Sequence, residues 1–199
     1  MTARPFSQAC ENNKRPILQV LQEVLATARE VLELGSGTGQ HARFFAEQLP
    51  HLRWRPTDLE ENLAGIRGWA QEYRGDNLLR PLALDVRDET WPAPVKDAIF
   101  TANSLHIVAW PTVQALFSYL GRHAPGGNLL VVYGPFNYGG KYTSASNANF
   151  DRWLAARDPD SAIRDFEAVD QLATAAGYRL QADYAMPANN RTLVWRKLG

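Results

Sequence analysis

The chain has 199 residues, a length typical of one compact α/β domain with a substantial core. Lysine plus arginine number 21, as do aspartate plus glutamate, so the composition lacks the basic excess typical of nucleic-acid binders. Residues 1–25 carry five charges and no apolar run reaches membrane-spanning length, so we expect neither a signal peptide nor a membrane anchor.

Cys10 is the only cysteine, which excludes an intramolecular disulfide, and the histidines do not complete a cluster with zinc-ligand spacing. We therefore expect a cytoplasmic protein with no metal site and no nucleic-acid or membrane partner. Nothing in the sequence indicates the oligomeric state.

The first half of the chain predicts helices that alternate with strands. Pro16 is expected in the first turn of a helix whose apolar residues have the spacing of a core-facing stripe. Strands at 30–34 and 52–57 flank a helix that Pro50 ends, and a further helix runs from Leu63 to a stop at Gly75. Short strands at 82–84 and 98–102 follow. The apolar stripe of the first helix consists of Ile17, Val20, Leu21, Val24 and Leu25.

The second half continues the alternation. A helix is expected at 111–120 and a strand at 128–133. Residues 134–162 are rich in Gly, Asn, Ser and Tyr, with a helix near 150–156, and we interpret them as a lid-like insert. Asp165 can cap a helix that Gly177 ends, and strands at 178–184 and 192–197 flank a turn at 187–190.

This order of elements predicts one α/β domain over residues 1–199, with a mostly parallel sheet wound on both faces and an antiparallel C-terminal hairpin at one edge. Residues 1–29 form its N-terminal cap and helix. Ligands of such sheets bind beyond the carboxyl ends of the strands, so the polar residues that follow each strand are the candidates for function.

A glycine-rich turn follows the first strand. Gly35, Gly37 and Gly39 alternate there, which allows positive φ and leaves backbone N–H groups free to face a ligand. A dinucleotide fingerprint requires glycine where this chain has Gln40, so a pyrophosphate ligand is disfavoured. The alternative is a tight strand-to-helix connection without a ligand.

Glu33 lies in the same apolar strand, where an unpaired carboxylate is costly to bury. It needs a cation or a hydrogen-bond donor, either an Arg or Lys of the chain or a ligand. The acid followed by G-x-G-x-G resembles the first motif of class I S-adenosylmethionine-dependent methyltransferases. This resemblance implies a Rossmann-like, doubly wound, seven-stranded sheet. It also implies that the methionine end of S-adenosylmethionine binds Glu33, Gly35, Ser36, Gly37 and Gly39.

Carboxylates also follow the second and third strands. Asp58, with Leu59 beside it, can accept hydrogen bonds from both ribose hydroxyls of an adenosyl group, but it also fits a capping box with Glu61. The resemblance implies that Asp85 accepts from the adenine amine while Val86 packs on the ring. Asp85 can equally be a turn former.

Asn103 follows the fourth strand where the resemblance places the methyl donor, and His106 and Trp110 follow it. We expect Asn103 to contact the cofactor and, with His106, to act in catalysis by orienting the acceptor or taking its proton. The alternative is that Asn103 bonds local backbone and His106 is an interior histidine. The expected acceptor-binding residues are Asn13, Lys14, His106, Trp110, Tyr133, Phe136 and Tyr138.

Nearly the whole chain resembles an uncharacterised family of methyltransferase-like proteins. The resemblance rests on residues 11–16, 33–39, 103–110 and 133–136. It implies an S-adenosylmethionine-dependent methyltransferase that acts on a small-molecule acceptor by in-line methyl transfer. Two alternatives stay open: a non-catalytic protein that binds S-adenosylmethionine or S-adenosylhomocysteine, and an NAD(P)-dependent oxidoreductase. The oxidoreductase lacks a Tyr-x-x-x-Lys pair, because Tyr138 and Lys141 are one residue too close.

Overall fold

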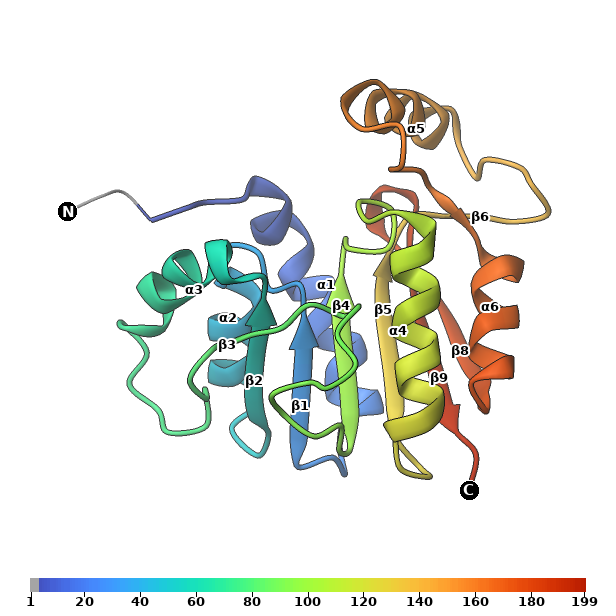
Figure 1. Ribbon diagram of the computed structural model, residues 1–199. Coiled ribbons are helices and arrows are strands. Elements are labelled where there is room, and N and C mark those ends of the chain that lie inside the picture. The colour runs from blue at the N-terminus through green and yellow to red at the C-terminus, as the bar shows by residue number, and fades with distance from the viewer. Residues whose placement is uncertain (1–3) are drawn as a thin grey trace. The chain divides into compact units, whose positions relative to one another are not determined.

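The computed structural model describes residues 4–199, in which helices alternate with strands (Figure 1). The α-helices are α1 (Gln8–Val24), α2 (Gln40–Gln48), α3 (Leu63–Ala70), α4 (Trp110–His123), α5 (Ala145–Arg157) and α6 (Phe166–Ala175). The strands are β1 (Glu30–Leu34), β2 (Arg53–Asp58), β3 (Leu82–Ala83), β4 (Ala98–Ala102), β5 (Leu129–Gly134), β6 (Phe136–Asn137), β7 (Arg164–Asp165), β8 (Tyr178–Met186) and β9 (Asn190–Lys197). Across residues 4–199, every helix is too short or too polar to cross a membrane.

The chain forms two compact units, one up to Thr101 and one from Ala102 onward. In the first unit the strands pair in the order β3-β2-β1-β4, and each neighbouring pair is parallel. The register places Glu33 of β1 opposite Pro56 of β2 and Phe100 of β4. This unit therefore contains the glycine-rich turn at the carboxyl end of its central strand.

An aromatic cluster forms the core of the first unit. β1 is buried along its whole length after Glu30, because parallel strands are covered on both faces. Phe45 of α2, Trp54 of β2 and Phe100 of β4 are fully buried, with ring centroids 5.4–5.6 Å apart. Figure 1 shows α1 and α2 behind these strands. The cluster fixes the position of β1, and with it the turn that follows.

The second unit contains the antiparallel hairpin. β9 pairs with β5 on one side and with β8 on the other, both antiparallel, and a bulge interrupts the β8 register between Leu180 and Ala182. Trp195 of β9 lies opposite Leu130 of β5 and is fully buried. The helices α4 and α6 lie in front of these strands in Figure 1. Residues 178–197 therefore form the predicted hairpin, with β9 on its inner side.

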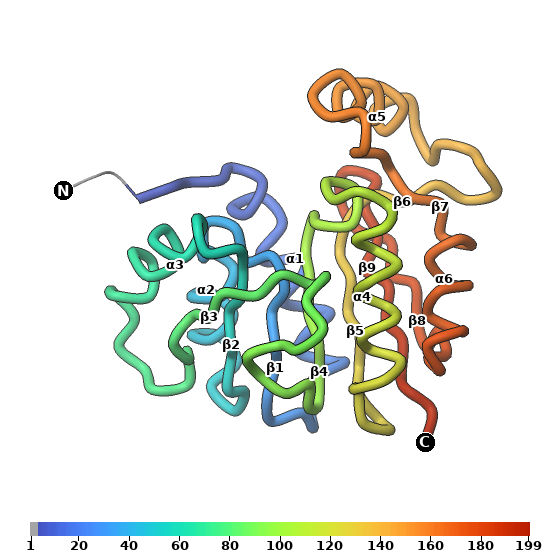
Figure 2. The backbone as a smooth tube through the Cα atoms, in the orientation of Figure 1, coloured from blue at the N-terminus to red at the C-terminus, as the bar shows by residue number. Residues whose placement is uncertain are grey.

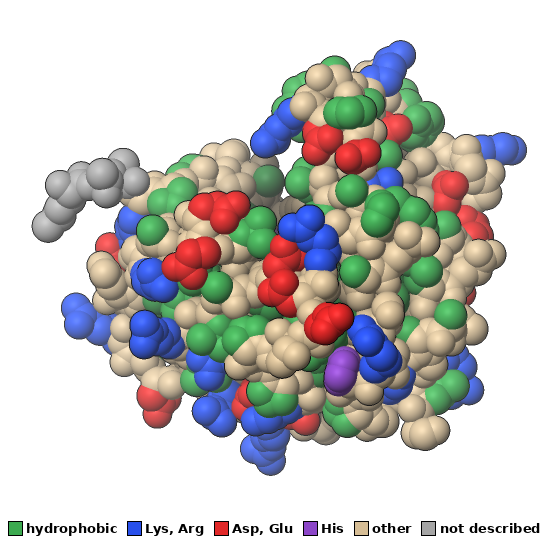
Figure 3. All heavy atoms as spheres, in the orientation of Figure 1, with side chains coloured by type: hydrophobic (Ala, Val, Ile, Leu, Met, Phe, Trp, Pro, Cys, Tyr) green, Lys and Arg blue, Asp and Glu red, His purple; other side chains and the backbone are tan. Residues whose placement is uncertain are grey.

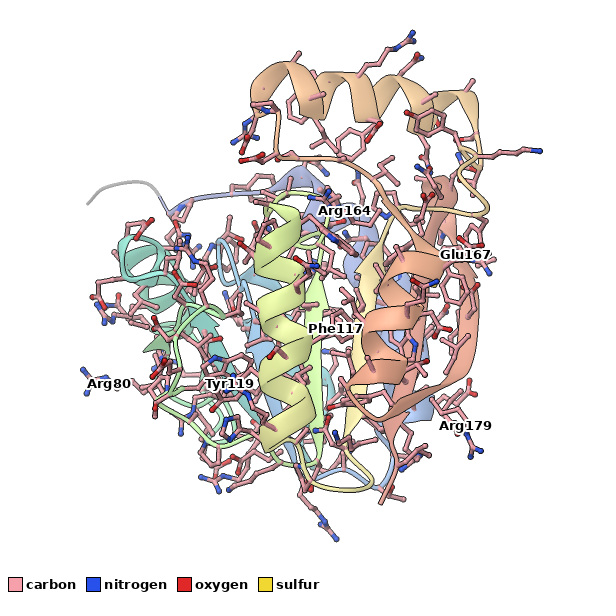
Figure 4. All side chains as sticks on the ribbon, turned by 45° about the vertical axis from the view of Figure 1, so that its right-hand side comes forward. Arg80, Phe117, Tyr119, Arg164, Glu167 and Arg179 are labelled. Atoms are coloured by element: carbon pink, nitrogen blue, oxygen red, sulfur yellow. The ribbon has the colours of Figure 1, made fainter. Side chains whose placement is uncertain are left out.

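Residues 134–166 of the second unit form a separate small sheet and α5. β6 and β7 run parallel and lie side by side, with α5 above them (Figure 2). The guanidinium of Arg164 donates to the carbonyl oxygens of Leu105, Val108 and Asp160 at 3.1, 2.6 and 2.8 Å, and Figure 4 shows its side chain near the upper end of α4. Trp153 of α5 is 53% exposed, and hydrophobic side chains lie on the surface of this helix at the top of Figure 3.

Taken together, the described strands form a seven-stranded sheet in the order β3-β2-β1-β4-β5-β9-β8, besides the two-stranded β6-β7 sheet. The sheet is mostly parallel, and its last strand in sequence lies antiparallel between β5 and β8. This order confirms the predicted Rossmann-like α/β fold.

The predicted start of the first helix is wrong. α1 begins at Gln8, with the Ser7 hydroxyl accepting from the backbone N–H of Cys10, so Pro16 lies inside the helix. An interior proline removes a helical hydrogen bond and costs about 3 kcal/mol. The helix extends past it because its first two turns contact the glycine-rich turn through Gln40.

Two smaller boundaries and one capping bond also differ from the prediction. α3 ends at Ala70, before Gly75. In the segment that follows, the hydroxyl of Tyr73 donates a hydrogen bond to the side chain of Asn77. α5 is longer than the expected 150–156, since Ser144 caps it at its start. Asp165 is the N-cap of α6 but makes no side-chain capping bond.

Replacing Asn77 with alanine should destabilise the first unit. The buried Asn77 amide donates to the carbonyl oxygens of Ala46, Leu49 and Leu52, which ties the end of α2 to β2. Loss of this amide leaves buried acceptors unpaired, so we expect the free energy of unfolding to fall by about 2–3 kcal/mol in urea denaturation. The exposed Asn149 is the matched control. An equal loss in Asn77→Ala and Asn149→Ala would contradict this role.

Candidate functional site

The glycine-rich turn has the left-handed backbone that its sequence predicts. Gly35, Gly37 and Gly39 have φ of 67°, 57° and 88°. A Cβ on Gly39 would lie 2.8 Å from the Cα of Ile66, whereas a Cβ on Gly37 would meet no heavy atom within 4 Å. Gly39 therefore allows α3 to pack closely, while Gly37 borders open space where a ligand could approach the backbone.

Glu33 lies at the end of β1 and is only 2% exposed. Its Oε2 accepts a hydrogen bond from the indole Nε1–H of Trp54 at 2.9 Å, and Ser36 also bonds the carboxyl group. No ion pair with an arginine or lysine is found for Glu33 among residues 4–199. The described residues therefore do not support the alternative in which an arginine or lysine side chain of the protein neutralises Glu33.

The pKa of Glu33 is raised from 4.5 to about 7, chiefly by burial and to a smaller extent by the nearby carboxylate of Asp58. The hydrogen bonds from Trp54 and Ser36 favour the ionised form and offset part of this rise. Near neutral pH the carboxyl group is consequently balanced between its two protonation states. A bound cation beside it would shift that balance toward the carboxylate.

Asp58 braces the glycine-rich turn. Its Oδ2 accepts from the backbone N–H of Gly37 at 2.7 Å, and its Oδ1 accepts from the N–H of Leu59 and the amide of Asn62 at 2.8 and 2.7 Å. The predicted capping box with Glu61 is wrong, because Leu59 and Asn62 hold the N-cap positions of the two short helices that follow, without side-chain capping bonds. The carboxylate instead joins the ends of β1 and β2.

Asp85 and Val86 follow β3. Asp85 accepts from the backbone N–H of Arg87 at 2.9 Å and forms an ion pair with its guanidinium at 2.5 Å. This pairing holds the pKa of the Asp85 carboxyl below its usual value. The turn-forming alternative is thus present in the structure. Contact of Asp85 and the half-buried Val86 with adenine stays a prediction.

Gln40 fastens the start of α1 to the glycine-rich turn. Its Oε1 accepts from the Ser7 N–H at 2.6 Å and from the Thr38 hydroxyl at 3.0 Å, and its Nε2 donates to Glu11 at 2.9 Å. Sequence reasoning treated Gln40 only as a missing glycine. Its hydrogen-bond partners Ser7 and Glu11 are distant in the sequence, so the spacing of residues around the turn could not reveal them.

Asn13 and Lys14 have partners within the protein. Asn13 Oδ1 lies 2.7 Å from His41 Nε2, and burial lowers the pKa of His41 to about 4, so this ring is neutral. Lys14 forms an ion pair with Glu11 at 2.5 Å, and its ammonium lies 5.0 Å from the centroid of the Phe44 ring. Their expected contact with an acceptor stays a prediction.

In the second unit, Asn103 and His106 follow β4. Asn103 has a left-handed backbone, φ 57°, and its N–H donates to the Tyr133 carbonyl at 2.8 Å. His106 is 4% exposed, and burial, together with the charge of Arg164, lowers its pKa to about 4. Its ring packs edge-on against Phe150. Within residues 4–199, no hydrogen bond to the ring nitrogens of His106 is found, so the neutral imidazole keeps its acceptor capacity.

The aromatic candidates of the second unit differ in accessibility. Tyr133 and Phe136 are buried, and Trp110 lies beneath the guanidinium of Arg164 at 5.8 Å. The hydroxyl of Tyr138 donates to Asp183 at 2.7 Å, and burial raises the pKa of this tyrosine. Nothing in the sequence indicated this role of Asp183, because it lies 45 residues after Tyr138 in the chain.

The Glu33→Gln variant should remove a pH dependence of stability. The pKa of Glu33 is higher in the folded chain, about 7, than its ordinary 4.5, so the unfolded chain loses its proton first as pH rises. The stability that neutral Glu33 provides is complete below pH 4.5 and is lost as pH rises through about 7. The stability gain of the variant over wild type should thus grow by about 3 kcal/mol between these pH values. Urea denaturation across this range measures it, and a constant difference would contradict the burial argument.

Several solved methyltransferases share this fold. An O-methyltransferase family protein from Burkholderia thailandensis superposes with a TM-score of 0.83 at 15% identity, over 96% of this chain and 58% of that protein. Human N-acetylserotonin methyltransferase in complex with SAM gives 0.81 at 17% identity, over 96% and 53%. An O-methyltransferase family 2 protein from Planctomyces limnophilus in complex with apigenin gives 0.76 at 16% identity, over 94% and 62%.

The chain thus spans between 53% and 62% of the length of these three proteins, and the likeness shows a shared fold. A family model described as a protein of unknown function, DUF938, matches residues 4–197. This match covers nearly the whole sequence, including β1, the glycine-rich turn and the segment after β4. The chain belongs to the DUF938 family.

Proposed function

We propose that this protein is an S-adenosylmethionine-dependent methyltransferase that acts on a small-molecule acceptor by in-line methyl transfer. The observation that carries the proposal is the buried carboxyl of Glu33, which has hydrogen-bond donors but forms no ion pair with an arginine or lysine among residues 4–199. A cofactor with an ammonium group supplies that cation. The fold of the human enzyme solved with SAM supports the same cofactor.

The residues of the first unit fit the cofactor. Glu33 would bind the ammonium, and the turn from Gly35 to Gly39, with Ser36, would hold the methionine end through its backbone. Open space at Gly37 is consistent with a ligand against this backbone. S-adenosylmethionine supplies an activated methyl group on a sulfonium.

Asp58 would bind the ribose. A carboxylate has about four acceptor positions, and Asp58 accepts three hydrogen bonds from the protein, so capacity remains for a ribose hydroxyl. The exposed Leu59, with Asp85 and Val86, would border the adenine. Arg87 donates two hydrogen bonds to each carboxylate oxygen of Asp85, so the backbone of Asp85 is the group that would be available to the base.

On the acceptor side, His106 would take the proton that the acceptor loses, and Asn103 would contact the cofactor and orient the acceptor. Alignment and exclusion of water supply most of the acceleration for a displacement in which charge on sulfur disappears. His106 is neutral and its ring nitrogens make no hydrogen bond within residues 4–199, so a ring nitrogen would be available to accept a hydrogen bond from the acceptor. Trp110, Tyr133, Phe136, Tyr138, Asn13 and Lys14 would bind the acceptor.

A second candidate is a non-catalytic protein that binds S-adenosylmethionine or S-adenosylhomocysteine. It is favoured by the partners that Tyr138, Asn13 and Lys14 already have within the protein, since these occupy groups expected to face an acceptor. An oxidoreductase is less well supported. The dinucleotide fingerprint has its last glycine at the sixth position, where this chain has Gln40, and Gln40 is 3% exposed and hydrogen-bonded to α1.

Replacing Gly37 with asparagine should abolish cofactor binding without unfolding the protein. Asparagine tolerates the left-handed backbone, and its side chain would enter the open space beside the turn. We expect wild type to bind S-adenosylhomocysteine in isothermal calorimetry and Gly37→Asn to lose at least about tenfold in affinity.

The matched control is Gly127→Asn, because Gly127 also has positive φ, 85°, and open space around its Cβ position. It should bind as wild type does. Unchanged affinity in Gly37→Asn would contradict the placement of the cofactor at this turn.

Turnover distinguishes the enzyme from the non-catalytic candidate. Incubation with labelled S-adenosylmethionine and a metabolite extract should yield S-adenosylhomocysteine only when the extract is present. Asn103→Gly, which keeps the left-handed backbone at this position, should lower that rate by about tenfold or more. Tight cofactor binding without extract-dependent turnover would favour the non-catalytic candidate.

A further inference from the structure

Among the described residues of β2, Trp54 is the one whose side chain forms a hydrogen bond with the Glu33 carboxyl. Its Nε1–H donates to Glu33 Oε2 at 2.9 Å, and the side chain is fully buried. β2 pairs with β1 in a register that puts Trp54 opposite Val31, two residues before Glu33. An indole has a single donor, so this hydrogen bond sets the orientation of one carboxyl oxygen.

We propose that Trp54 is a positioning residue for cofactor binding: its indole N–H holds Oε2 of Glu33 and favours the carboxylate, which leaves Oε1 to face the ammonium of the ligand. This inference rests on the proposed function, because it assigns Trp54 a role through Glu33. Trp54 itself need not touch the cofactor.

The groups around Glu33 show why one hydrogen bond matters. Asp58 of β2 disfavours a second negative charge, and Cys10 of α1 is electrostatically coupled to Glu33. On β4, the register partner is the apolar Phe100. The groups that favour ionised Glu33 are therefore Trp54 and Ser36. Loss of the indole donor would leave Ser36 alone in this role, and the pKa of Glu33 would rise.

His41 of α2 is a further titratable side chain near this cluster. Its ring stacks on Phe45 at 5.2 Å and lies edge-on to Phe100 at 6.5 Å. Burial lowers its pKa to about 4, so it stays neutral through the range in which Glu33 titrates and supplies no positive charge. A pH dependence near neutrality therefore belongs to Glu33.

Packing alone does not require an indole at position 54. The aromatic cluster with Phe45 and Phe100 needs a large ring, which phenylalanine also provides. Trp54→Phe therefore removes the N–H and keeps most of the ring contact. Trp195 is a matched control, because it is also fully buried and its Nε1–H donates to an acid, Asp170, at 2.8 Å.

The test is calorimetric binding of S-adenosylhomocysteine from about pH 5.5 to 7.5, where an α-amino group stays mostly protonated. Wild-type affinity should rise with pH as Glu33 ionises. In Trp54→Phe the curve of affinity against pH should move to higher pH by about one unit. At the acid end of the range, this variant should therefore bind about tenfold more weakly than wild type. Trp195→Phe should follow wild type. Binding of 5′-methylthioadenosine, which lacks the ammonium, should be independent of pH and equal in all three proteins.

Each outcome has a distinct meaning. If wild type binds S-adenosylhomocysteine and Trp54→Phe gives the same pH curve, the role of Trp54 is overturned and the proposed function stands. If wild type does not bind S-adenosylhomocysteine, the proposed function fails, and this inference fails with it. Equal shifts in Trp54→Phe and Trp195→Phe would indicate a general effect of packing and would also overturn the inference.

A second measurement does not need the Trp54 variant to fold. In ¹⁵N-labelled wild type, the indole N–H resonance of Trp54 should titrate with the midpoint of Glu33, near pH 7, and lose this dependence in Glu33→Gln. The resonance of Trp195 should not follow that midpoint. A Trp54 resonance that is independent of pH would overturn the inference.

Discussion

The rest of the site depends on one buried carboxyl group, that of Glu33, which forms no ion pair with any of residues 4–199. Glu33 is buried near the end of β1, where ionisation costs free energy, and among residues 4–199 the groups that favour its ionised form are the hydrogen-bond donors Trp54 and Ser36. A sequence selected for stability alone would have an apolar residue or glutamine here. Under the proposed function the counter-charge would come from a ligand, which is a trade of stability for binding.

The surrounding structure keeps this carboxyl group in place. Asp58 binds the turn through the N–H of Gly37, Gln40 ties the turn to α1, and Gly39 lets α3 approach the backbone. These contacts come from four different elements, so the turn is held from several sides while the space at Gly37 stays open. Rigid support around an open position is what a binding site for a small ligand requires.

The sequence predicted the fold well, because strands and helices here have strong local signals. The apolar run of β1, the glycine-rich turn and the hairpin at the C-terminus all appeared where expected. Local rules failed where tertiary contacts decide: α1 continues through Pro16, and Asp58 binds the backbone of the glycine-rich turn, where local spacing offered a capping box with Glu61 as an alternative. Trp54 was missed for the same reason, since its bond to Glu33 depends on strand register. The roles of the candidate site residues stay predictions.

The most direct measurement of the central claim is a ¹³C NMR titration of the Glu33 side-chain carboxyl carbon, with and without S-adenosylhomocysteine. The account predicts a midpoint near pH 7 in the free protein and a carboxylate that stays ionised about one pH unit or more below that value when the ligand is bound. A midpoint near 4.5 in the free protein, or a titration curve that the bound ligand does not move, would contradict it.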